Sequence, residues 1–429
     1  MNFLMNENFL HYIWQFRFFD SGSLFTAAGE KLEIIKPGEH NTDGGPDFHN
    51  ARIRIGNTTW AGNIEIHINA SDWHKHNHHK DQSYNNIILH VVYNNDYTAT
   101  RSNKEPIPVL ELKELIPQEI YNKYKNIINS NQWIPCQKQI KHIDPLILIS
   151  WMDRMIVERL EKKAELINLT LQNTKNNWEQ AFYIHIARNF GFKLNSEPFE
   201  MLAKSTALSC LAKHKNNLLQ IEAILFGQAG LLKNNLTEKY PSELRHEYSI
   251  LKQKFNLSPI NGHLWKFLRL HPSGFPTIRI AQFAALLHKS SHLFSNIIES
   301  RRLSEIEIML NAECSEYWLT HYVFGKGSPN RSKKIGESAI DNLVINTVVP
   351  FLFVYGQKKK EEKYKDRAIR FLEQLDGEKN SVITKWKLLG MPVNTASNTQ
   401  ALLELKNNYC NLKQCLSCSI GNFILKKIK

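Results

Sequence analysis

Apolar and polar residues alternate along two neighbouring segments near the start of the chain, and this alternation predicts two strands. Over residues 51–55, apolar side chains alternate with arginines, and over residues 64–68, isoleucines alternate with Glu65 and His67. Because successive side chains of a strand point to opposite faces, Glu65 and His67 share the face that is not apolar. A turn at residues 56–58 would join the two strands as a hairpin.

The hairpin also predicts which residues face each other. A turn centred on Asn57 places Asp47 opposite His67, so that Glu65 is the diagonal neighbour of Asp47, about 7–8 Å away between α-carbons. A slip of one residue would put the two carboxylates on opposite faces of the sheet. The expectation that Asp47 and Glu65 share one face therefore depends on this register.

Patterns on both sides of the hairpin predict a small α/β domain. Helical spacing of apolar residues predicts a helix over residues 7–19, and a strand over residues 32–36 ends at a Pro-Gly pair. After the hairpin, a histidine-rich helix over residues 72–85 precedes an almost continuously apolar strand over residues 87–93. A connection of this length suits a helical crossover, so the strand should run parallel to the one that carries Glu65.

Beyond residue 98 the pattern changes twice. Residues 99–144 are polar and contain several prolines, which indicates a connector with one short helix over residues 118–128. From residue 145 onward helical periodicity dominates, and it predicts helices over residues 147–168, 178–190, 198–211, 220–227, 242–255 and 281–290. We expect three parts: an α/β domain over residues 1–98 with a mixed sheet flanked by helices, a connector over 99–144, and a mostly α-helical domain over 145–429.

Composition places the chain among soluble globular proteins. Its 429 residues are 42% hydrophobic and 22% charged, which is enough to build a core without disulfide bonds. Lys and Arg total 54 against 41 Asp and Glu, and the net charge of +13 favours polyanionic partners such as DNA or RNA. The first residues lack a signal-peptide pattern, and the longest apolar stretch, residues 343–355, is too short to span a bilayer. We expect a cytoplasmic protein without membrane contact.

Two carboxylates on adjacent strands, with a basic residue two positions after the second, suit a divalent metal beside a phosphate. Carboxylate oxygens are ligands for Mg²⁺ or Mn²⁺, and such a metal activates water and neutralises charge on phosphoryl oxygens. Asp47 and Glu65 are the expected ligands, and Glu39, in the polar loop before Asp47, is a candidate third carboxylate. This chemistry is that of metal-dependent phosphodiester cleavage.

The residues that carry this chemistry resemble a known motif. Pro46-Asp47 followed by Glu65-Ile66-His67 is similar to the motif of the PD-(D/E)XK nuclease superfamily, with histidine in the lysine position. The order of the predicted elements over the α/β domain is similar as well. The resemblance implies a metal-dependent nuclease acting on DNA or RNA, in which Asp47, Glu65 and His67 are catalytic.

Histidine at the lysine position is a departure from that motif. Lysine is a permanent cation, whereas histidine is half charged only near pH 6.5. His67 could still orient the attacking water. The whole chain is also similar to an uncharacterised bacterial family catalogued as domain of unknown function 2851, through the segments GPDF, GNIEIH, Asp72-Trp73 and ILHVV. That resemblance implies no activity.

Further polar residues are candidates for accessory roles. In the superfamily the first helix often sends a polar residue toward the metal, which implies Glu7 or Gln15 here. The crossover histidines lie on several faces of the predicted helix, so we expect one or two of them to face the site; they are His74, His76, His78 and His79.

Two other functions compete with the nuclease hypothesis. The crossover histidines also resemble the HxHxDH loop of metallo-β-lactamase-type enzymes, with His78 where that loop has aspartate, and this resemblance implies a zinc-dependent hydrolase. The remaining alternative is a nucleic-acid-binding or scaffolding protein on a catalytically decayed nuclease fold. Without a metal, the two carboxylates would repel each other across a short gap, which favours the nuclease over the scaffold.

Three of the six cysteines crowd near the end of the chain as Cys410-x4-Cys415-x2-Cys418. In a cytoplasmic protein this spacing favours a zinc or iron–sulphur site over disulfides, and it matches the first three ligands of a plant-type [2Fe–2S] site. Cys136 is the best candidate for a fourth ligand. The alternative is that these cysteines are small apolar residues of a helical core.

Aromatic and cationic residues interleave over residues 265–280. Lys266, Arg269 and Arg279 are candidates for phosphate contacts, while the aromatic side chains pack or stack on bases. The alternative is that the aromatic residues are structural and that the arginines pair with carboxylates.

Overall fold

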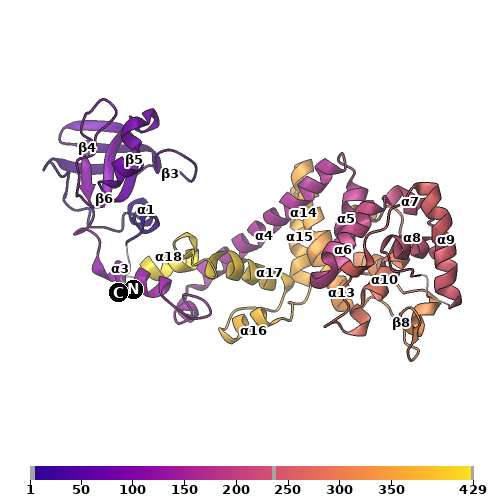
Figure 1. The fold of residues 1–429 in the computed structure, drawn as a ribbon. Helices are drawn as coiled ribbons and strands as arrows, with labels where there is room; N and C mark the ends of the chain where they lie inside the picture. Colours follow the sequence, from indigo (N-terminus) through magenta and orange to yellow (C-terminus); the bar gives the residue numbers. More distant parts are fainter. Residues whose placement is uncertain (1–4, 234–237, 427–429) are drawn as a thin grey trace. The chain divides into compact units, whose positions relative to one another are not determined.

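The computed structural model describes residues 5–233 and 238–426, which divide into two compact units (Figure 1). Unit 1 comprises Met1–Trp151 and Leu405–Lys429, and unit 2 comprises Met152–Glu404. This division differs from the expected one, because residues 99–144 fold into unit 1 instead of linking two domains. The end of the chain also returns to unit 1, which hydrophobic periodicity along the sequence does not reveal.

A seven-stranded mixed sheet lies at the centre of unit 1, in the order β1-β2-β4-β5-β6-β7, with β3 paired to β4. Its β2, β4 and β5 are antiparallel neighbours, whereas β6 runs parallel to β5 and β7 parallel to β6. The predicted hairpin and parallel crossover are therefore confirmed. The strands are Leu24–Phe25 (β1), Lys31–Lys36 (β2), Glu39–His40 (β3), Phe48–Ile55 (β4), Thr58–Asn69 (β5), Ile87–Asn94 (β6) and Val109–Glu111 (β7).

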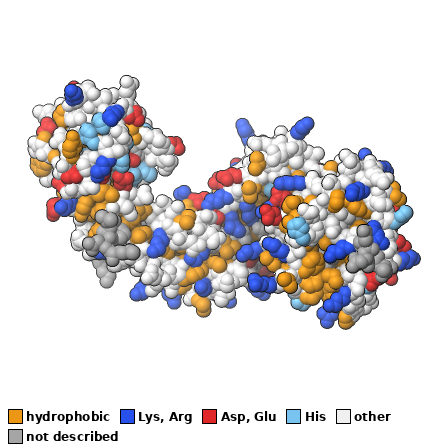
Figure 2. Space-filling model, in the orientation of Figure 1, with side chains coloured by type: hydrophobic (Ala, Val, Ile, Leu, Met, Phe, Trp, Pro, Cys, Tyr) orange, Lys and Arg blue, Asp and Glu red, His pale blue; other side chains and the backbone are white. Residues whose placement is uncertain are grey.

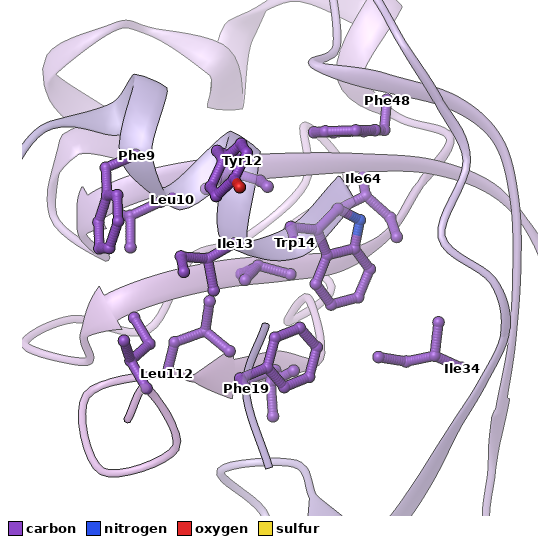
Figure 3. Close-up of a cluster of buried hydrophobic side chains, with 14 of the residues drawn as sticks. Phe9, Leu10, Tyr12, Ile13, Trp14, Phe19, Ile34, Phe48, Ile64 and Leu112 are labelled. Carbon is purple, nitrogen blue, oxygen red and sulfur yellow. The ribbon is translucent and has the colours of Figure 1, made fainter. Parts of the chain in front are cut away.

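The first helix, α1 (Glu7–Phe16), supplies one side of the main core of unit 1. Its buried Phe9, Ile13 and Trp14 belong to the same apolar cluster as Ile64 of β5 (Figure 3). The helix ends earlier than predicted because Arg17 takes a left-handed φ of 53° and its N–H bonds back to the last turn. This core holds α1 against the strands that carry the polar residues of interest.

The crossover from β5 to β6 consists of three short turns instead of the single helix predicted over residues 72–85. These are α2 (Asp72–Lys75), η1 (His78–Lys80) and η2 (Gln82–Tyr84). Asn77, with a left-handed φ of 62°, separates the first two turns, and the Asp81 side chain caps the third. Trp73 of α2 is fully buried and packs with Tyr84 in a second apolar cluster.

The rest of unit 1 is helical. Helix α3 (Gln118–Ile128) forms as predicted, and its Ile120 and Tyr124 join the main core. The last segment contributes Cys415 and Leu425 to that core. The remaining elements are η3 (Ile140–His142), the π-helix η8 (Leu405–Cys410), η9 (Cys415–Ser417) and α18 (Ser419–Lys426).

Unit 2 is mostly helical, as the periodicity predicts. Its first helix, α4 (Pro145–Asn173), begins with the last residues of unit 1 and continues into unit 2. Its further helices are α5 (Trp178–Phe190), α6 (Phe192–Ser205), α7 (Leu208–Ala212), α8 (Leu218–Gln228), α9 (Lys239–Phe255), α10 (Pro276–Lys289), α11 (Leu293–Glu299), α12 (Leu303–Leu310), α13 (Glu337–Leu343), α14 (Val349–Lys359), α15 (Glu362–Gln374), α16 (Ser381–Leu388) and α17 (Ala396–Glu404). Short 3₁₀ turns η4 (Gly262–Leu264), η5 (Pro272–Gly274) and η6 (Glu316–Leu319), a π-helix η7 (Val344–Val348), and the two strands β8 (His321–Val323) and β9 (Lys326–Gly327) complete it.

One helical run of unit 2, Glu337–Lys359, is long and apolar enough to cross a membrane by length and composition. It is longer than the apolar stretch seen in the sequence, because α13, η7 and α14 join end to end. Within the fold, 78% of its most apolar window is buried. Packing in the core of unit 2 accounts for this apolar character.

Candidate metal centre

The register of the β4–β5 hairpin differs from the predicted one. Ile55 pairs with Thr58 around a turn at residues 56–57, which is one residue away from the expected pairing. Had this pairing continued along both strands, Asp47 would lie on the face opposite to Glu65.

A bulge in β4 returns the two carboxylates to one face. Residues 49–50 stand where β5 has a single residue, and Asn50 takes a left-handed φ of 56°. Beyond the bulge the pairing has shifted by one further residue, so Asp47 lies opposite Glu65 instead of opposite His67. Asp47 and Glu65 share a face as expected. They do so because the one-residue shift at the turn and the one-residue shift at the bulge together displace the pairing by two residues, which restores the face.

Hydrogen bonds join each carboxylate to the neighbouring strand. The Asp47 N–H donates to Glu65 Oε2 at 3.2 Å, and the Ile66 N–H donates to Asp47 Oδ2 at 2.9 Å. The loop before Asp47 is held by Asn41, whose backbone N–H and side-chain amide donate to carbonyl oxygens within it. The position of both carboxylates is therefore set by the backbone.

Glu65 is 5% exposed, and no lysine or arginine forms an ion pair with it in the part of the chain that the structure describes. Burial first, and the negative charge of Asp47 second, raise the pKa of Glu65 to about 9, against an ordinary 4.5. The Asp47 N–H and His11 oppose this rise. Without a cation, Glu65 is protonated at neutral pH.

Three histidines, His67, His76 and His78, bring ring nitrogens to within 4.8 Å of one another next to Glu65. The Nε2 atom of His67 lies 3.1 Å from His76 Nδ1 and 3.7 Å from Glu65 Oε1, and His78 Nε2 lies 3.3 Å from the same oxygen. We call these three residues the histidine trio. Figure 2 shows histidine side chains, in pale blue, on the surface of unit 1.

His90 on β6 contacts the Nδ1 atom of His67. His67 Nδ1 lies 2.8 Å from His90 Nε2, and both residues are buried. Burial, followed by the charge of the neighbouring imidazoles, lowers the pKa of His67 to about 2, and burial lowers that of His90 to about 3. Both rings are therefore neutral, which is the form that binds metals.

Two imidazole nitrogens face carboxylate oxygens without making a hydrogen bond. His78 Nε2 lies 3.3 Å from Glu65 Oε1, and His11 Nε2 lies 3.3 Å from Asp47 Oδ2, but both nitrogens are buried with no hydrogen-bond partner. Ligands at 2.0–2.2 Å from one tetrahedral metal are about 3.3–3.6 Å apart. Each of these two pairs thus has the spacing of two ligands of one divalent cation, with carboxylates that suit Mg²⁺ or Mn²⁺ and imidazoles that suit zinc. Among the described residues, only the histidine trio brings three donor atoms within 4.8 Å of one another.

The broken crossover explains why His76 and His78 meet. In one continuous helix, residues two apart would point about 200° from each other. The left-handed Asn77 between them ends α2 and lets both rings turn toward β5. Tyr84 then stacks on His78 at 3.8 Å between ring centroids, and Trp73 packs edge-on at 5.3 Å.

The structure brings Asp47, Glu65, His67 and His76 together and leaves other predicted residues apart. Glu39 does not join the group, because its exposed carboxylate accepts a hydrogen bond from Lys36 Nζ at 2.7 Å. Gln15 is exposed on the last turn of α1, and His74 and His79 stack on each other at 4.1 Å and are not in the trio. The prediction of Glu39 as a third ligand is thus not supported by this arrangement.

Sequence reasoning missed His11 and His90 as parts of the site, and it named His78 only as one of the four crossover histidines. His11 lies one helical turn after Glu7, the residue already considered on that helix, and burial raises the pKa of Glu7 near His76 and Asp47. His90 interrupts an otherwise apolar strand, which is itself a signal. No sequence signal indicates that His78 faces the site, because its orientation depends on the break in the crossover at Asn77.

The predicted phosphate-binding residues lie in unit 2. Lys266 and Arg269 are exposed, and their role stays a prediction. Arg279 on α10 lies 4.5 Å from the Phe192 ring centroid and donates to Gln282 Oε1 at 2.9 Å. Burial lowers its pKa to about 10. Arg279 therefore packs within unit 2, as the structural alternative expects, although its partner is the Gln282 amide and not a carboxylate.

Comparison with family models places the chain in a family whose function is unknown. A family model described as "Protein of unknown function (DUF2851)" matches residues 7–381, a range that includes the whole candidate centre. Comparisons with curated proteins and with solved structures gave no match.

Proposed function

The chain belongs to the DUF2851 family of proteins of unknown function, and from its site we propose that unit 1 is a metal-dependent nuclease that hydrolyses phosphodiester bonds of DNA or RNA. One observation carries the proposal. Asp47, directly before β4, and Glu65, on the adjacent strand β5, are held side by side by hydrogen bonds. A carboxylate oxygen of each residue lies 3.3 Å from a buried imidazole nitrogen that has no hydrogen-bond partner.

The order of elements supports the same proposal. Helix α1 precedes the antiparallel strands β2, β4 and β5, and a crossover then leads to the parallel strand β6. This is the order that the PD-(D/E)XK resemblance implies, with Asp47 directly before β4, and Glu65 and His67 on β5. The mixed sheet is what the superfamily hypothesis needs, although many unrelated functions share such sheets.

Each residue of the site has a distinct role in this proposal. Asp47 and Glu65 hold the cation, with His78 and His11 as the nearest supplementary donors. A divalent metal, when bound, supplies Lewis acidity that activates water and offsets charge on the phosphoryl oxygens. His67, held through Nδ1 by His90, would orient the attacking water through Nε2, the nitrogen that lies 3.1 Å from His76 Nδ1 in the metal-free protein. Because imidazoles contribute, we expect Mn²⁺ to support more activity than Mg²⁺.

A polar hollow next to the bulge supports a polyanionic substrate. Its volume is about 690 Å³, and its lining includes Lys36, Arg52 and the bulge residue Asn50. Lysine and arginine are the usual contacts of the phosphate backbone. The hollow begins three residues after Asp47, so a strand bound there would be guided along β4.

The decisive test is cleavage of a panel of single- and double-stranded DNA and RNA by the full-length chain. We expect cleavage with Mn²⁺ that falls at least about 10²-fold in Asp47→Asn, because one carboxylate ligand is lost. Asp43→Asn, an exposed aspartate of the same loop, is the matched control and should cleave normally. Salt-sensitive binding without cleavage under any metal would favour the scaffolding alternative instead.

A zinc-dependent hydrolase remains the second candidate, and the histidine trio is the observation that favours it. Three imidazole nitrogens within 4.8 Å of one another form the donor set of a catalytic zinc site, with Glu65 beside them. In this case His67 is a metal ligand and does not orient water. Metal affinity of a His67 variant separates the two functions, as described in the Discussion.

Metal affinity should depend on pH through Glu65. The bound cation requires the ionised carboxylate, whereas burial holds the pKa of Glu65 at about 9. We expect Mn²⁺ affinity, measured by calorimetry, to rise by up to about tenfold per pH unit between pH 6 and 8. In the metal-free protein the sign is opposite: the stabilisation from protonated Glu65 is complete below pH 4.5 and is lost as pH rises through about 9. A flat affinity profile would contradict the assignment of Glu65 as a ligand.

A further inference from the structure

Four of the six cysteines meet in unit 1, although one of them lies more than 270 residues before the others in the sequence. All four are free thiols, three buried and Cys410 half-buried. They come from the segment after α3 and from η8, η9 and the residue before α18. In every pair of the four, the charge of one thiolate raises the pKa of the other, so all lie near one another.

Contacts between the two segments hold this group together. Lys406 of η8 donates through Nζ to the carbonyl oxygen of Trp133 at 2.8 Å, and the same ammonium lies 5.0 Å from the Trp133 ring centroid. Trp133 is three residues before Cys136, and Lys406 is four residues before Cys410. On the other side, Trp151 packs edge-on against Tyr409 at 5.3 Å between ring centroids.

Two features of the local backbone lie at these cysteines. Residues Leu405–Cys410 form a π-helix, a rare conformation that is frequent at functional sites. Gly421 allows α18 to approach η9, because a Cβ there would lie 2.1 Å from the Cys415 carbonyl oxygen.

Cys418 has the surroundings of a ligand thiolate. Cys418 directly precedes α18, and the N–H groups of Ile420 and Gly421 in the first turn of that helix hydrogen-bond to its sulphur. Hydrogen bonds to the sulphur are a characteristic of iron–sulphur ligands, whose potentials they tune.

The spacing of the thiols distinguishes between two kinds of metal site. Four thiolates around one zinc, at 2.3 Å from the metal, lie about 3.8 Å from one another. Among the described residues, however, the histidine trio is the only group of three or more with all ligand atoms within 4.8 Å. The four thiols are thus close but wider apart than a zinc site requires. An iron–sulphur cluster spreads its thiolates over two or more irons.

We propose that Cys136, Cys410, Cys415 and Cys418 bind an iron–sulphur cluster that joins the end of the chain to the segment after α3. The cluster links two segments of unit 1 that are distant in sequence. It is independent of the nuclease proposal, because the carboxylates and the histidine trio of the candidate metal centre are not among its ligands.

The test is metal analysis of the full-length chain, purified without oxygen and reconstituted with ferrous iron and sulphide. We expect about two to four irons with an equal amount of acid-labile sulphide per chain, and visible absorption that bleaches on reduction. Two irons would indicate a [2Fe–2S] cluster and four a [4Fe–4S] cluster. Zinc without sulphide, a disulfide among the four cysteines, or a folded protein without bound metal would overturn the proposal.

Substitution identifies the ligands. Cys136→Ser and Cys410→Ser should each lower bound iron and sulphide by about tenfold or more, because a cluster that lacks one thiolate is labile. Cys210→Ser and Cys314→Ser, which replace buried free thiols of unit 2, are the matched controls and should keep both. If the ligand variants fail to fold, Mössbauer spectra of the wild-type protein decide, since four-sulphur coordination of iron is required. Full iron and sulphide in Cys136→Ser would exclude the distant ligand.

Glu65→Gln separates this inference from the nuclease proposal. That variant should keep iron and labile sulphide in full while losing the Mn²⁺ site. Sulphide also distinguishes the cluster from iron that binds the histidine trio, because that site contains none. Loss of sulphide in Glu65→Gln would contradict two independent sites.

Discussion

Glu65→Gln should abolish Mn²⁺ binding and lower the rate of nucleic acid cleavage by at least about 10³-fold, since a bound metal contributes several kcal/mol of charge stabilisation. The amide keeps the shape of the carboxyl group but cannot ionise. Glu65 Oε1 lies 3.3 Å from His78 Nε2 and 3.7 Å from His67 Nε2, so the substitution removes the charge of the carboxylate beside two imidazoles of the trio. Calorimetric titration with Mn²⁺ and single-turnover cleavage measure the two effects.

The same substitution should leave the metal-free fold intact. Burial holds the pKa of Glu65 at about 9, so at pH 7 the side chain is protonated and glutamine resembles it closely. We expect the free energy of unfolding without metal to change by less than about 1 kcal/mol. Glu33→Gln, which removes an exposed carboxylate paired with Arg54 on the same sheet, is the control. Mn²⁺ that still stabilises Glu65→Gln against heat would show that the metal binds elsewhere.

His67→Ala should lower cleavage by about 10²–10⁴-fold, the usual effect of removing a group that positions or accepts a proton. If His67 orients water, as the nuclease proposal requires, Mn²⁺ affinity should change much less than in Glu65→Gln. If the trio instead holds a catalytic zinc, the variant should lose the metal. His142→Ala, an exposed histidine of η3, controls for unspecific effects.

His67→Lys examines the departure from the superfamily motif. The introduced ammonium would lie beside Glu65 Oε1, now 3.7 Å from the imidazole, and would lower the pKa of that carboxyl group. We expect more activity than in His67→Ala and a pH profile displaced to lower pH. A lysine variant as inactive as the alanine variant would argue that the imidazole itself is needed.

The strands and their polar face were predictable from local pattern. Period-2 alternation around Glu65 and His67 requires two faces of different polarity, and a crossover between β5 and β6 requires parallel strands. Helix α3 was predicted with its observed bounds, because its ends carry clear local signals. Each of these features is determined by a few residues that are neighbours in the sequence, so the local pattern is enough to predict it.

The position of Asp47 was only partly predictable. Asp47 shares a face with Glu65, as the predicted register requires, but the observed pairing reaches this result through both the turn at residues 56–57 and the bulge at Asn50. Either shift alone would separate the carboxylates. The free-energy cost of a bulge is small, and its position depends on the packing of the whole sheet. The alternation of residue types along one strand therefore does not predict where a bulge lies.

The sequence by itself determined the residue types of the site and the strands that carry Asp47, Glu65 and His67. Tertiary structure decided which further groups meet them, because contacts across elements are set by packing and not by spacing along the chain. His11 reaches the site because the apolar residues of α1 pack that helix against the sheet. His78 reaches it because the left-handed Asn77 breaks the crossover helix. The gathering of Cys136 with the three terminal cysteines likewise exists only because the chain's end folds back into unit 1.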